Sequence, residues 1–218
     1  MFRKRGDGAF YFARENASVL NKQKRAPKKV IMNKGKRSNT PKGGENETNQ
    51  EQSGAESALH ELFLDELADV YNAEQQITKA LPKMAKAARS PELREAFQTH
   101  LEETEEQISR LEEVAESLGE KLKGKKCKAM EGLLAEGKEI MEEQADSPAL
   151  DAGLILAAQK VEHYEIASYG ALCAWAQSMG HDDAFDLLKQ TLDEEITTDE
   201  KLNQLAESLN AEAQQQTD

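Results

Sequence analysis

From about residue 56 onward, apolar side chains recur at alternating steps of three and four, the spacing that places them on one face of an α-helix. No run rich in Val, Ile or Thr alternates with polar residues, so the pattern contains no β-strand. We therefore expect four long helices and one short helix. Their predicted ranges are Ser57–Ala88, Pro91–Leu118, Ala129–Glu143, Leu150–Ser178 and Asp182–Ala211.

Prolines and glycines mark several predicted helix ends. Ser90 and Pro91 form a helix start, because proline suits the first helical position, where its missing N–H would have no partner. Gly119 and Gly180 each follow a long apolar stripe and predict C-terminal glycines. Pro82 lies inside the first helix, where we expect a kink or a local irregularity.

The connection between the second and third long helices indicates the topology. Residues 119–149 are too many for a hairpin loop, and they contain the short helix. Two helical hairpins joined by one long crossover are typical of a ferritin-like antiparallel four-helix bundle. This all-α bundle is predicted to occupy residues 56–212, with a frayed C-terminus at residues 213–218.

An internal repeat supports the pairing of the two hairpins. A shift of 91 residues places Glu74 on Glu165 and Leu111 on Leu202, so one offset aligns both helices of each hairpin. Single matches arise by chance among helices of this pattern, so the repeat is a hypothesis. It would relate the hairpins by a pseudo-two-fold axis, with Glu74 and Glu165 facing each other across it.

Acidic or imidazole side chains interrupt every long apolar stripe near its middle. A carboxylate among apolar side chains is costly unless it is paired, hydrogen-bonded or bound to a metal. Acidic residues at one height on four helices would repel one another, and two divalent cations would remove that repulsion. The candidate metal ligands are Glu74, His100, Glu103, Glu162, Glu165, Glu194 and Glu195.

The types of ligand indicate which metal to expect. Oxygen-rich ligation with a little imidazole suits iron or manganese better than zinc, so we expect two iron ions, with manganese as the alternative. Many such bundles carry Glu-x-x-His on two helices. Here the second helix has the reverse order, His100-x-x-Glu103, and the last has Glu194 and Glu195 without a histidine. The site is therefore expected to be carboxylate-dominated, asymmetric or vestigial.

Simpler interpretations exist for several of these residues. Glu103, Glu194 and Glu195 lie in the acid-rich runs HLEETEEQ and LDEEITTDE, which are typical of solvated helix faces. The choice of ligand within each run therefore stays open. His100 fits a hydrogen-bonded core histidine as well as it fits a metal ligand.

Other polar residues near the same level have supporting roles at most. Tyr71 and Tyr164 flank the candidate ligands, where they either pack or hydrogen-bond a ligand carboxylate. His163 points away from the apolar stripe, which favours a surface position or a contact with a ligand. His60 and His181 are expected to face solvent.

Charge separates the N-terminal part of the chain from the rest. Residues 1–50 contain 13 Lys and Arg against 4 Asp and Glu, and the remaining residues contain 15 against 37. The segment 1–55 lacks a hydrophobic pattern, so we expect a disordered basic tail. It is either a solvated extension, a weak contact for phosphate backbones or anionic membranes, or a segment preceding a true start at Met32. The acidic folded domain is not expected to bind nucleic acid.

The remaining sequence features bear on location. No stretch of about 18 apolar residues is present, so no membrane span is expected. The N-terminus lacks the apolar segment of a signal peptide. Cys127 and Cys173 are the only cysteines, and their spacing gives no disulfide framework. A cytoplasmic location is expected.

The segments around the candidate ligands resemble those of a known family. DVYNAEQQITKALPKMAKA, AFQTHLEETEEQISRLEEV, CKAMEGLLAEG, AAQKVEHYEIASYG and LLKQTLDEEITTDEKL are similar, in this order, to segments of the YciE/YciF ferritin-like stress proteins of bacteria. The match covers about residues 56–212, and EHYEIASYG is its most specific element. The resemblance implies a dimeric ferritin-like domain linked to stress response, with a di-iron-type site and no established reaction.

Three functions follow as hypotheses. The first is a metal-binding stress protein that oxidises Fe(II) with oxygen or peroxide, as a ferroxidase or peroxidase would. The second is a non-catalytic dimeric interaction module, whose polar core is vestigial or only fixes the register of the helices. The third, iron storage in a cage, lacks any recognisable assembly feature in the sequence.

Overall fold

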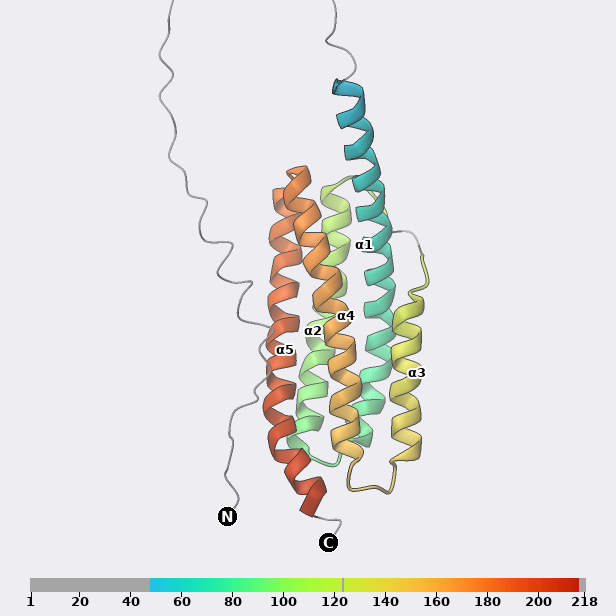
Figure 1. Ribbon diagram of the computed structural model, residues 1–218, viewed down its shortest axis with the longest axis vertical. Coiled ribbons are helices and arrows are strands. Elements are labelled where there is room, and N and C mark those ends of the chain that lie inside the picture. The colour runs from blue at the N-terminus through green and yellow to red at the C-terminus, as the bar shows by residue number, and fades with distance from the viewer. Residues whose placement is uncertain (1–47, 123, 216–218) are drawn as a thin grey trace, which may run out of the picture. The chain divides into compact units, whose positions relative to one another are not determined.

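The chain folds into five α-helices (Figure 1), which a computed structural model describes for residues 48–122 and 124–215, with side chains from residue 58 onward. The helices are α1 (Thr48–Ala87), α2 (Pro91–Ser117), α3 (Lys128–Glu143), α4 (Leu150–Met179) and α5 (Asp182–Gln215). Within these residues there is no β-strand. The predicted all-α class is confirmed.

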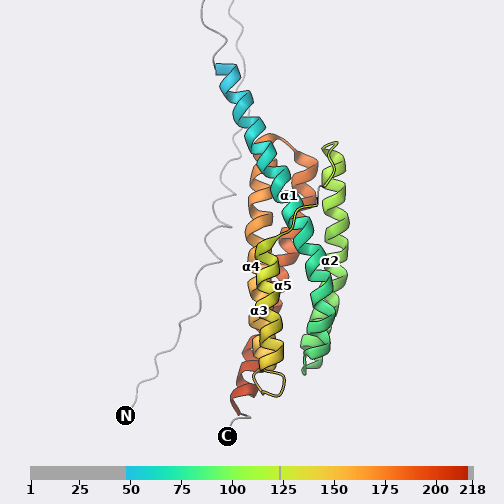
Figure 2. The same ribbon diagram turned by 90° about the vertical axis from the view of Figure 1, so that its right-hand side faces the viewer.

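Four of the helices pack as two antiparallel hairpins. α1 packs against α2 and α4 against α5, and the hairpins meet where α2 contacts α5 and α1 contacts α4. The short helix α3 belongs to the long crossover and lies along α1 and α4, outside the four-helix core (Figure 2). This arrangement confirms the predicted bundle with a fifth helix in its crossover.

The predicted helix ends are formed by the residues that marked them. Ser90 Oγ accepts a hydrogen bond from the backbone N–H of Leu93 at 3.2 Å, which caps α2 immediately before Pro91. Gly119 and Gly180 have φ values of 71° and 75°, the left-handed conformation that glycine adopts without a Cβ clash.

The first helix is longer than the sequence predicted. α1 begins at Thr48 and not near Ser57, because its first turns precede the apolar stripe and periodicity alone does not detect them. Residues 48–55, which the sequence analysis placed in the basic tail, are therefore helical in backbone. The rest of that predicted tail lies outside the described residues.

Two further expectations concern the course of the helices. α1 continues through Pro82 to Ala87, so the proline does not end it. α5 continues past the predicted end at Ala211 to Gln215, and residues 216–218 lie outside the described part of the chain.

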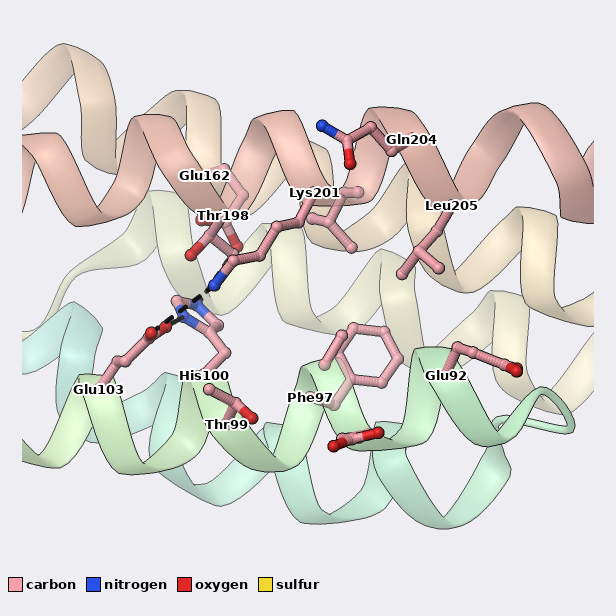
Figure 3. A pocket seen from close by; sticks show the side chains of 13 residues that line it. Glu92, Phe97, Thr99, His100, Glu103, Glu162, Thr198, Lys201, Gln204 and Leu205 are labelled. Carbon is pink, nitrogen blue, oxygen red and sulfur yellow. Dashed lines mark ion pairs between the residues drawn. The ribbon is translucent and has the colours of Figure 1, made fainter.

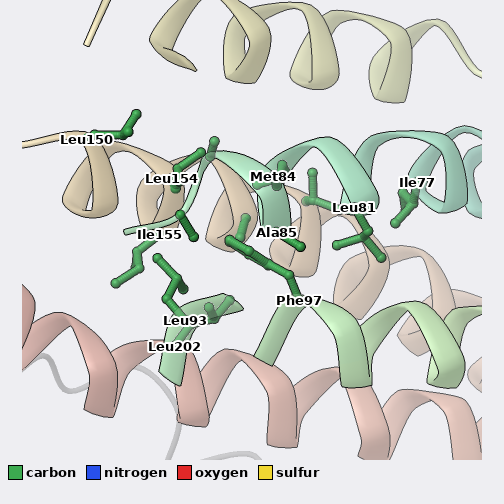
Figure 4. Close-up of a cluster of buried hydrophobic side chains, with 14 of the residues drawn as sticks. Ile77, Leu81, Met84, Ala85, Leu93, Phe97, Leu150, Leu154, Ile155 and Leu202 are labelled. Carbon is green, nitrogen blue, oxygen red and sulfur yellow. The ribbon is translucent and has the colours of Figure 1, made fainter. Parts of the chain in front are cut away.

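Two hydrophobic clusters and a polar layer between them fill the bundle. Cluster I includes Ile77, Leu81, Met84, Leu93, Phe97, Leu154, Ile155 and Leu202 (Figure 4). Cluster II includes Phe63, Leu67, Val70, Leu111, Val114, Tyr169, Leu172 and Leu188. The polar layer consists of Glu74, His100, Thr104, Gln107, Arg110, Glu162, Glu165, Ser168, Thr191, Glu195 and Thr198. The predicted stripes thus form the core, and their interruptions form the layer.

The described residues also bear on membrane insertion and on thiol chemistry. None of their helices combines the length and the apolar character that crossing a bilayer requires. Cys127 and Cys173 are both buried and free.

Candidate metal centre

All four long helices contribute side chains to the middle of the polar layer. Glu74 comes from α1, His100 from α2, Glu162 and Glu165 from α4, and Glu195 from α5, and none is more than 4% exposed. Each lies where the apolar stripe of its helix passes through the core, so the fold itself turns it inward. Donor atoms of His100, Glu162, Glu165 and Glu195 all lie within 4.8 Å of one another.

These five side chains hold buried polar atoms that have no hydrogen-bond partner among the described residues. They are Glu74 Oε2, His100 Nδ1 and Nε2, Glu162 Oε2, Glu165 Oε1 and Oε2, and Glu195 Oε2. A buried polar atom without a partner loses its hydration and gains nothing in return. Because the unpartnered side chains of α2, α4 and α5 bring donor atoms within 4.8 Å of one another, they fit a shared cation better than they fit isolated packing defects.

Burial and mutual repulsion change the pKa values of the carboxyls. Burial raises the pKa of Glu74 to about 7, although the hydroxyl of Tyr169 acts against the shift. Burial also raises the pKa of Glu165 well above its ordinary value, with the charges of Glu195 and Glu74 adding to it. For Glu195, burial and the charge of Glu162 do the same. Without a cation, the layer therefore favours protonated carboxyls.

His100 lies between two carboxylates, one inside the layer and one at its edge. Its Nε2 is 3.2 Å from Glu162 Oε1, and its Nδ1 is 3.8 Å from Glu103 Oε2 (Figure 3). Neither contact has hydrogen-bond geometry. Burial opposes a charge on the imidazole, but Glu162 and Glu103 outweigh it and raise the pKa of His100 well above its usual range. Without a cation, His100 is therefore the positive partner of the nearby acids.

Glu195 is held by a hydrogen-bonded network between α2 and α5. Gln107 Nε2 donates to Glu195 Oε1 at 2.5 Å and to Glu194 Oε2 at 3.2 Å. Arg110 donates to both carboxylate oxygens of Glu194, at 2.9 Å and 3.0 Å, and to Thr191 Oγ1 at 2.6 Å. Such surrounding partners orient a ligating carboxylate.

Tyr169 contacts a candidate ligand, and the sequence analysis missed it. Its hydroxyl, buried at the cluster II side of the layer, donates to Glu74 Oε1 at 2.5 Å. Burial and the charge of Glu74 raise the pKa of Tyr169 well above its ordinary value, which keeps the hydroxyl protonated as a donor. The signal was present, since Tyr169 follows Glu165 by one helical turn and shares its face.

Three predicted ligands lie outside the group of close donors: Glu74, which is buried in the same layer, and Glu103 and Glu194. Glu103 is at the edge of the layer, with 31% of its side chain exposed, and has Lys201 as a second neighbour. The ion pair with His100 lowers the pKa of Glu103. Glu194 is occupied by Arg110. The structure thus brings four of the seven predicted side chains within 4.8 Å of one another, buries Glu74 in the same layer, and places Glu103 and Glu194 at the periphery.

The tyrosines and histidines that the sequence placed near the ligands make other contacts. The Tyr71 hydroxyl donates to Glu112, and the Tyr164 hydroxyl donates to Asp69. His163 is largely exposed and lies 3.4 Å from Asp199. The remaining two, His60 and His181, are half-buried and pack edge to face, so the expectation that they face solvent is only partly correct.

The chain belongs to the family described as Domain of unknown function (DUF892), whose model matches residues 58–215. It is 50% identical over 149 residues to Protein YciF of Escherichia coli K12, an alignment that covers 68% of this chain and 90% of that protein. The crystal structure of the E. coli stress protein YciF matches with a TM-score of 0.68 at 48% identity, covering 70% of this chain and 97% of the other.

A Rhodopseudomonas palustris protein, YcfI, gives a TM-score of 0.65 at 49% identity and covers 66% of this chain and 92% of its own. Together with the five observed helices, these likenesses confirm the YciE/YciF resemblance and the ferritin-like fold predicted from the sequence.

Proposed function

We propose that this member of the DUF892 family is a ferritin-like stress protein that holds two divalent cations, iron or manganese, in the middle of its bundle. The observation that carries the proposal is the convergence of unpartnered, buried donor atoms from α2, α4 and α5, with an unpartnered carboxylate oxygen of Glu74 from α1 buried in the same layer. The proposed ligands are Glu74, His100, Glu162, Glu165 and Glu195. Of the candidates from the sequence, Glu103 and Glu194 become neighbours of the site.

Charge supports two cations. Four carboxylates and one neutral imidazole carry a formal charge of about −4, which two divalent cations neutralise. Neutralisation would remove the repulsion that raises the pKa values of Glu165 and Glu195. A single cation would leave about two negative charges buried, which is costly in an apolar core.

The donor set supports iron or manganese. Four carboxylates and one imidazole are hard ligands of the kind these metals share, and neither buried thiol belongs to the group of donors. When loaded with iron, such a site supplies the oxidation of Fe(II) by oxygen or peroxide. The chain's own part is to fix the ligands: Tyr169 orients Glu74 and Gln107 orients Glu195. Clusters I and II bound the layer with apolar side chains on either side.

An anaerobic titration with Fe(II), followed by calorimetry, tests the proposal. The wild-type protein is expected to bind two equivalents. The isosteric variant Glu165→Gln should bind at least about 10-fold more weakly, since loss of a ligand exceeds the effect of losing its support. Glu105→Gln, which removes an exposed carboxylate from α2, is the matched control. Absence of binding, or binding by Glu165→Gln equal to that of the wild type, would contradict the proposal.

A non-catalytic interaction module is the second candidate, and one observation favours it. Tyr169, Gln107 and Arg110 already hydrogen-bond part of the polar layer, as they would if the layer only fixed the helix register. Thermal melting with and without a chelator separates the candidates. Bound metal raises the melting temperature by linkage, and a register device leaves it unchanged.

Two further elements of the proposal concern assembly and location. We expect a homodimer in the cytoplasm, where the two free thiols would stay reduced. The exposed apolar side chains Leu62, Leu156 and Ile196 are candidates for its contact surface. Light scattering after size exclusion measures the mass, and a strictly monomeric protein would remove the dimer from the proposal.

A further inference from the structure

A pocket of about 400 Å³ opens between α2 and α5 and ends at the candidate metal centre. Its inner wall contains His100 and Glu162, and its outer part contains Glu103, Thr198 and Lys201 (Figure 3). His100 and Glu162 are both proposed ligands, so the pocket connects the protein surface with the buried donor atoms.

The inner wall presents an unpartnered donor to the pocket. The His100 side chain is 95% buried, and its Nδ1 has no hydrogen-bond partner. On the Nδ1 side of the ring lies Glu103, 3.8 Å away, whereas Nε2 is directed at Glu162. The imidazole therefore stands between the pocket and the interior of the layer.

The outer part of the pocket is acidic. Glu92, Glu95 and Glu103 line it, and Lys201 is its only cationic side chain. A cleft lined by one sign of charge concentrates ions of the opposite sign and accelerates their association. This lining attracts a divalent cation and repels an anion.

The hypothetical 91-residue repeat relates two ion pairs between α2 and α5. The shift of 91 residues places Glu103 on Glu194 and Arg110 on Lys201. The pair of Arg110 with Glu194 is therefore equivalent to the pair of Lys201 with Glu103. The former is two-pronged, at 2.9 Å and 3.0 Å, and the latter is a single contact at 3.8 Å. The tight pair is partly buried, with Arg110 9% and Glu194 27% exposed, and the loose pair is more exposed and lies at the pocket.

We propose that this pocket is the route by which divalent cations reach the metal centre, with Glu103 as a transit carboxylate and Lys201 as the counter-ion that it releases. The inference rests on the proposed function. It gives Glu103 a role distinct from that of a permanent ligand: Glu103 binds the cation on its way and passes it to His100 and Glu162.

Stopped-flow measurements with Co²⁺ test the route, with association followed by absorbance and dissociation by a chase with EDTA. Ala96→Trp places a large side chain in the pocket without replacing a proposed ligand, since Ala96 lines the pocket and is half-buried. Glu103→Gln removes the transit charge. Glu102→Gln is the control, because Glu102 is an exposed neighbour on α2 outside the pocket lining.

Ala96→Trp and Glu103→Gln are each expected to slow association and dissociation alike, by about tenfold or more, with the equilibrium affinity nearly unchanged. Glu102→Gln should match the wild type. Wild-type rates in both pocket variants would overturn the route. Faster dissociation with unchanged association in Glu103→Gln would also overturn it, because that pattern belongs to a ligand. If the wild-type protein binds no Co²⁺, the proposed function fails, and the route fails with it. If the wild-type protein binds Co²⁺ and only the rates of the pocket variants differ from expectation, the route alone fails.

Discussion

Each end of the polar layer, where α2 packs against α5, carries one ion pair between a basic residue and a glutamate, but the basic residue differs between the ends. At the cluster II end, Arg110 donates two hydrogen bonds to Glu194 and one to Thr191. At the cluster I end, Lys201 stands 3.8 Å from Glu103 beside a pocket. A guanidinium matches a carboxylate in a planar, two-pronged geometry, whereas an ammonium is a point charge on a flexible stem. We therefore expect the Arg110–Glu194 pair to be rigid and the Lys201–Glu103 pair to open readily for a passing cation.

Replacing the basic side chains of the two ion pairs, Arg110 and Lys201, should change the free energy of unfolding by the most unequal amounts. Arg110→Met removes the two-pronged partner of Glu194 and the donor to Thr191, so metal-free protein should lose about 3 kcal/mol or more of unfolding free energy. Lys201→Met breaks a half-exposed contact and should cost at most about 1 kcal/mol. Urea denaturation in EDTA measures both. Equal losses in the two variants would remove the distinction between the ends.

The stability of the metal-free protein should depend on pH mainly through the buried carboxyls of the layer and less through the two flanking ion pairs. Burial raises the pKa values of Glu74, Glu165 and Glu195, so the folded chain binds protons more tightly than the unfolded chain. The stabilisation that these carboxyls give the metal-free protein is then fully present below their ordinary pKa near 4.5. It is lost as the pH rises through the raised pKa, which is about 7 for Glu74. For Glu74 alone, the loss is about 3 kcal/mol, at about 1.4 kcal/mol per pKa unit.

The measurement is urea unfolding in EDTA between pH 5 and pH 8. Saturating Mn²⁺ should reverse the slope, because cation binding requires deprotonated ligands. Constant or increasing stability of the metal-free protein over this range would show that the buried carboxyls do not take up protons.

The side chains that support the ligands should also differ between the ends. Gln107 holds Glu195, and the repeat places it on Thr198, which lines the pocket. Gln107→Leu should weaken Mn²⁺ binding about 10-fold to 100-fold, as loss of a supporting hydrogen bond does. Thr198→Val, the matched change at the open end, should leave the affinity close to that of the wild type. Calorimetry measures both, and a larger loss in Thr198→Val would reverse the proposed roles.

The smallest predicted effect comes from making the open end resemble the closed one. Lys201→Arg allows a two-pronged pair with Glu103, so Co²⁺ association should slow by a few-fold while stability stays unchanged or increases slightly. Lys189→Arg, at the exposed pair with Asp193, is the control. Faster association in Lys201→Arg would indicate that the pair does not guard the pocket.

Much of the bundle was predictable because local signals fixed it. Ser90 and Gly180 act through backbone geometry within one helical turn, so the sequence alone indicated those ends. Thr48 did not stand out as the start of α1, since the first turns precede the apolar stripe. Glu74 and Glu165 were identified because each fills a gap in a stripe that must face the core.

The details of the site were less predictable, for a geometric reason. Adjacent residues on a helix point about 100° apart, and the rotation of α5 about its own axis decides whether Glu194 or Glu195 faces inward. The side chains that bind these two glutamates, Arg110 and Gln107, lie on another helix. Contacts between helices of this kind have no signature in local spacing. Tyr169 was within reach, since it shares a face with Glu165.

The most direct test of the metal centre is anomalous diffraction from crystals grown with Mn²⁺. Two anomalous peaks are expected inside the bundle, bounded by Glu74, His100, Glu162, Glu165 and Glu195, with Glu194 still paired to Arg110. Crystals of Glu165→Gln should lose at least one of them. Peaks confined to surface carboxylates, or an empty polar layer at saturating Mn²⁺, would contradict a metal-binding core.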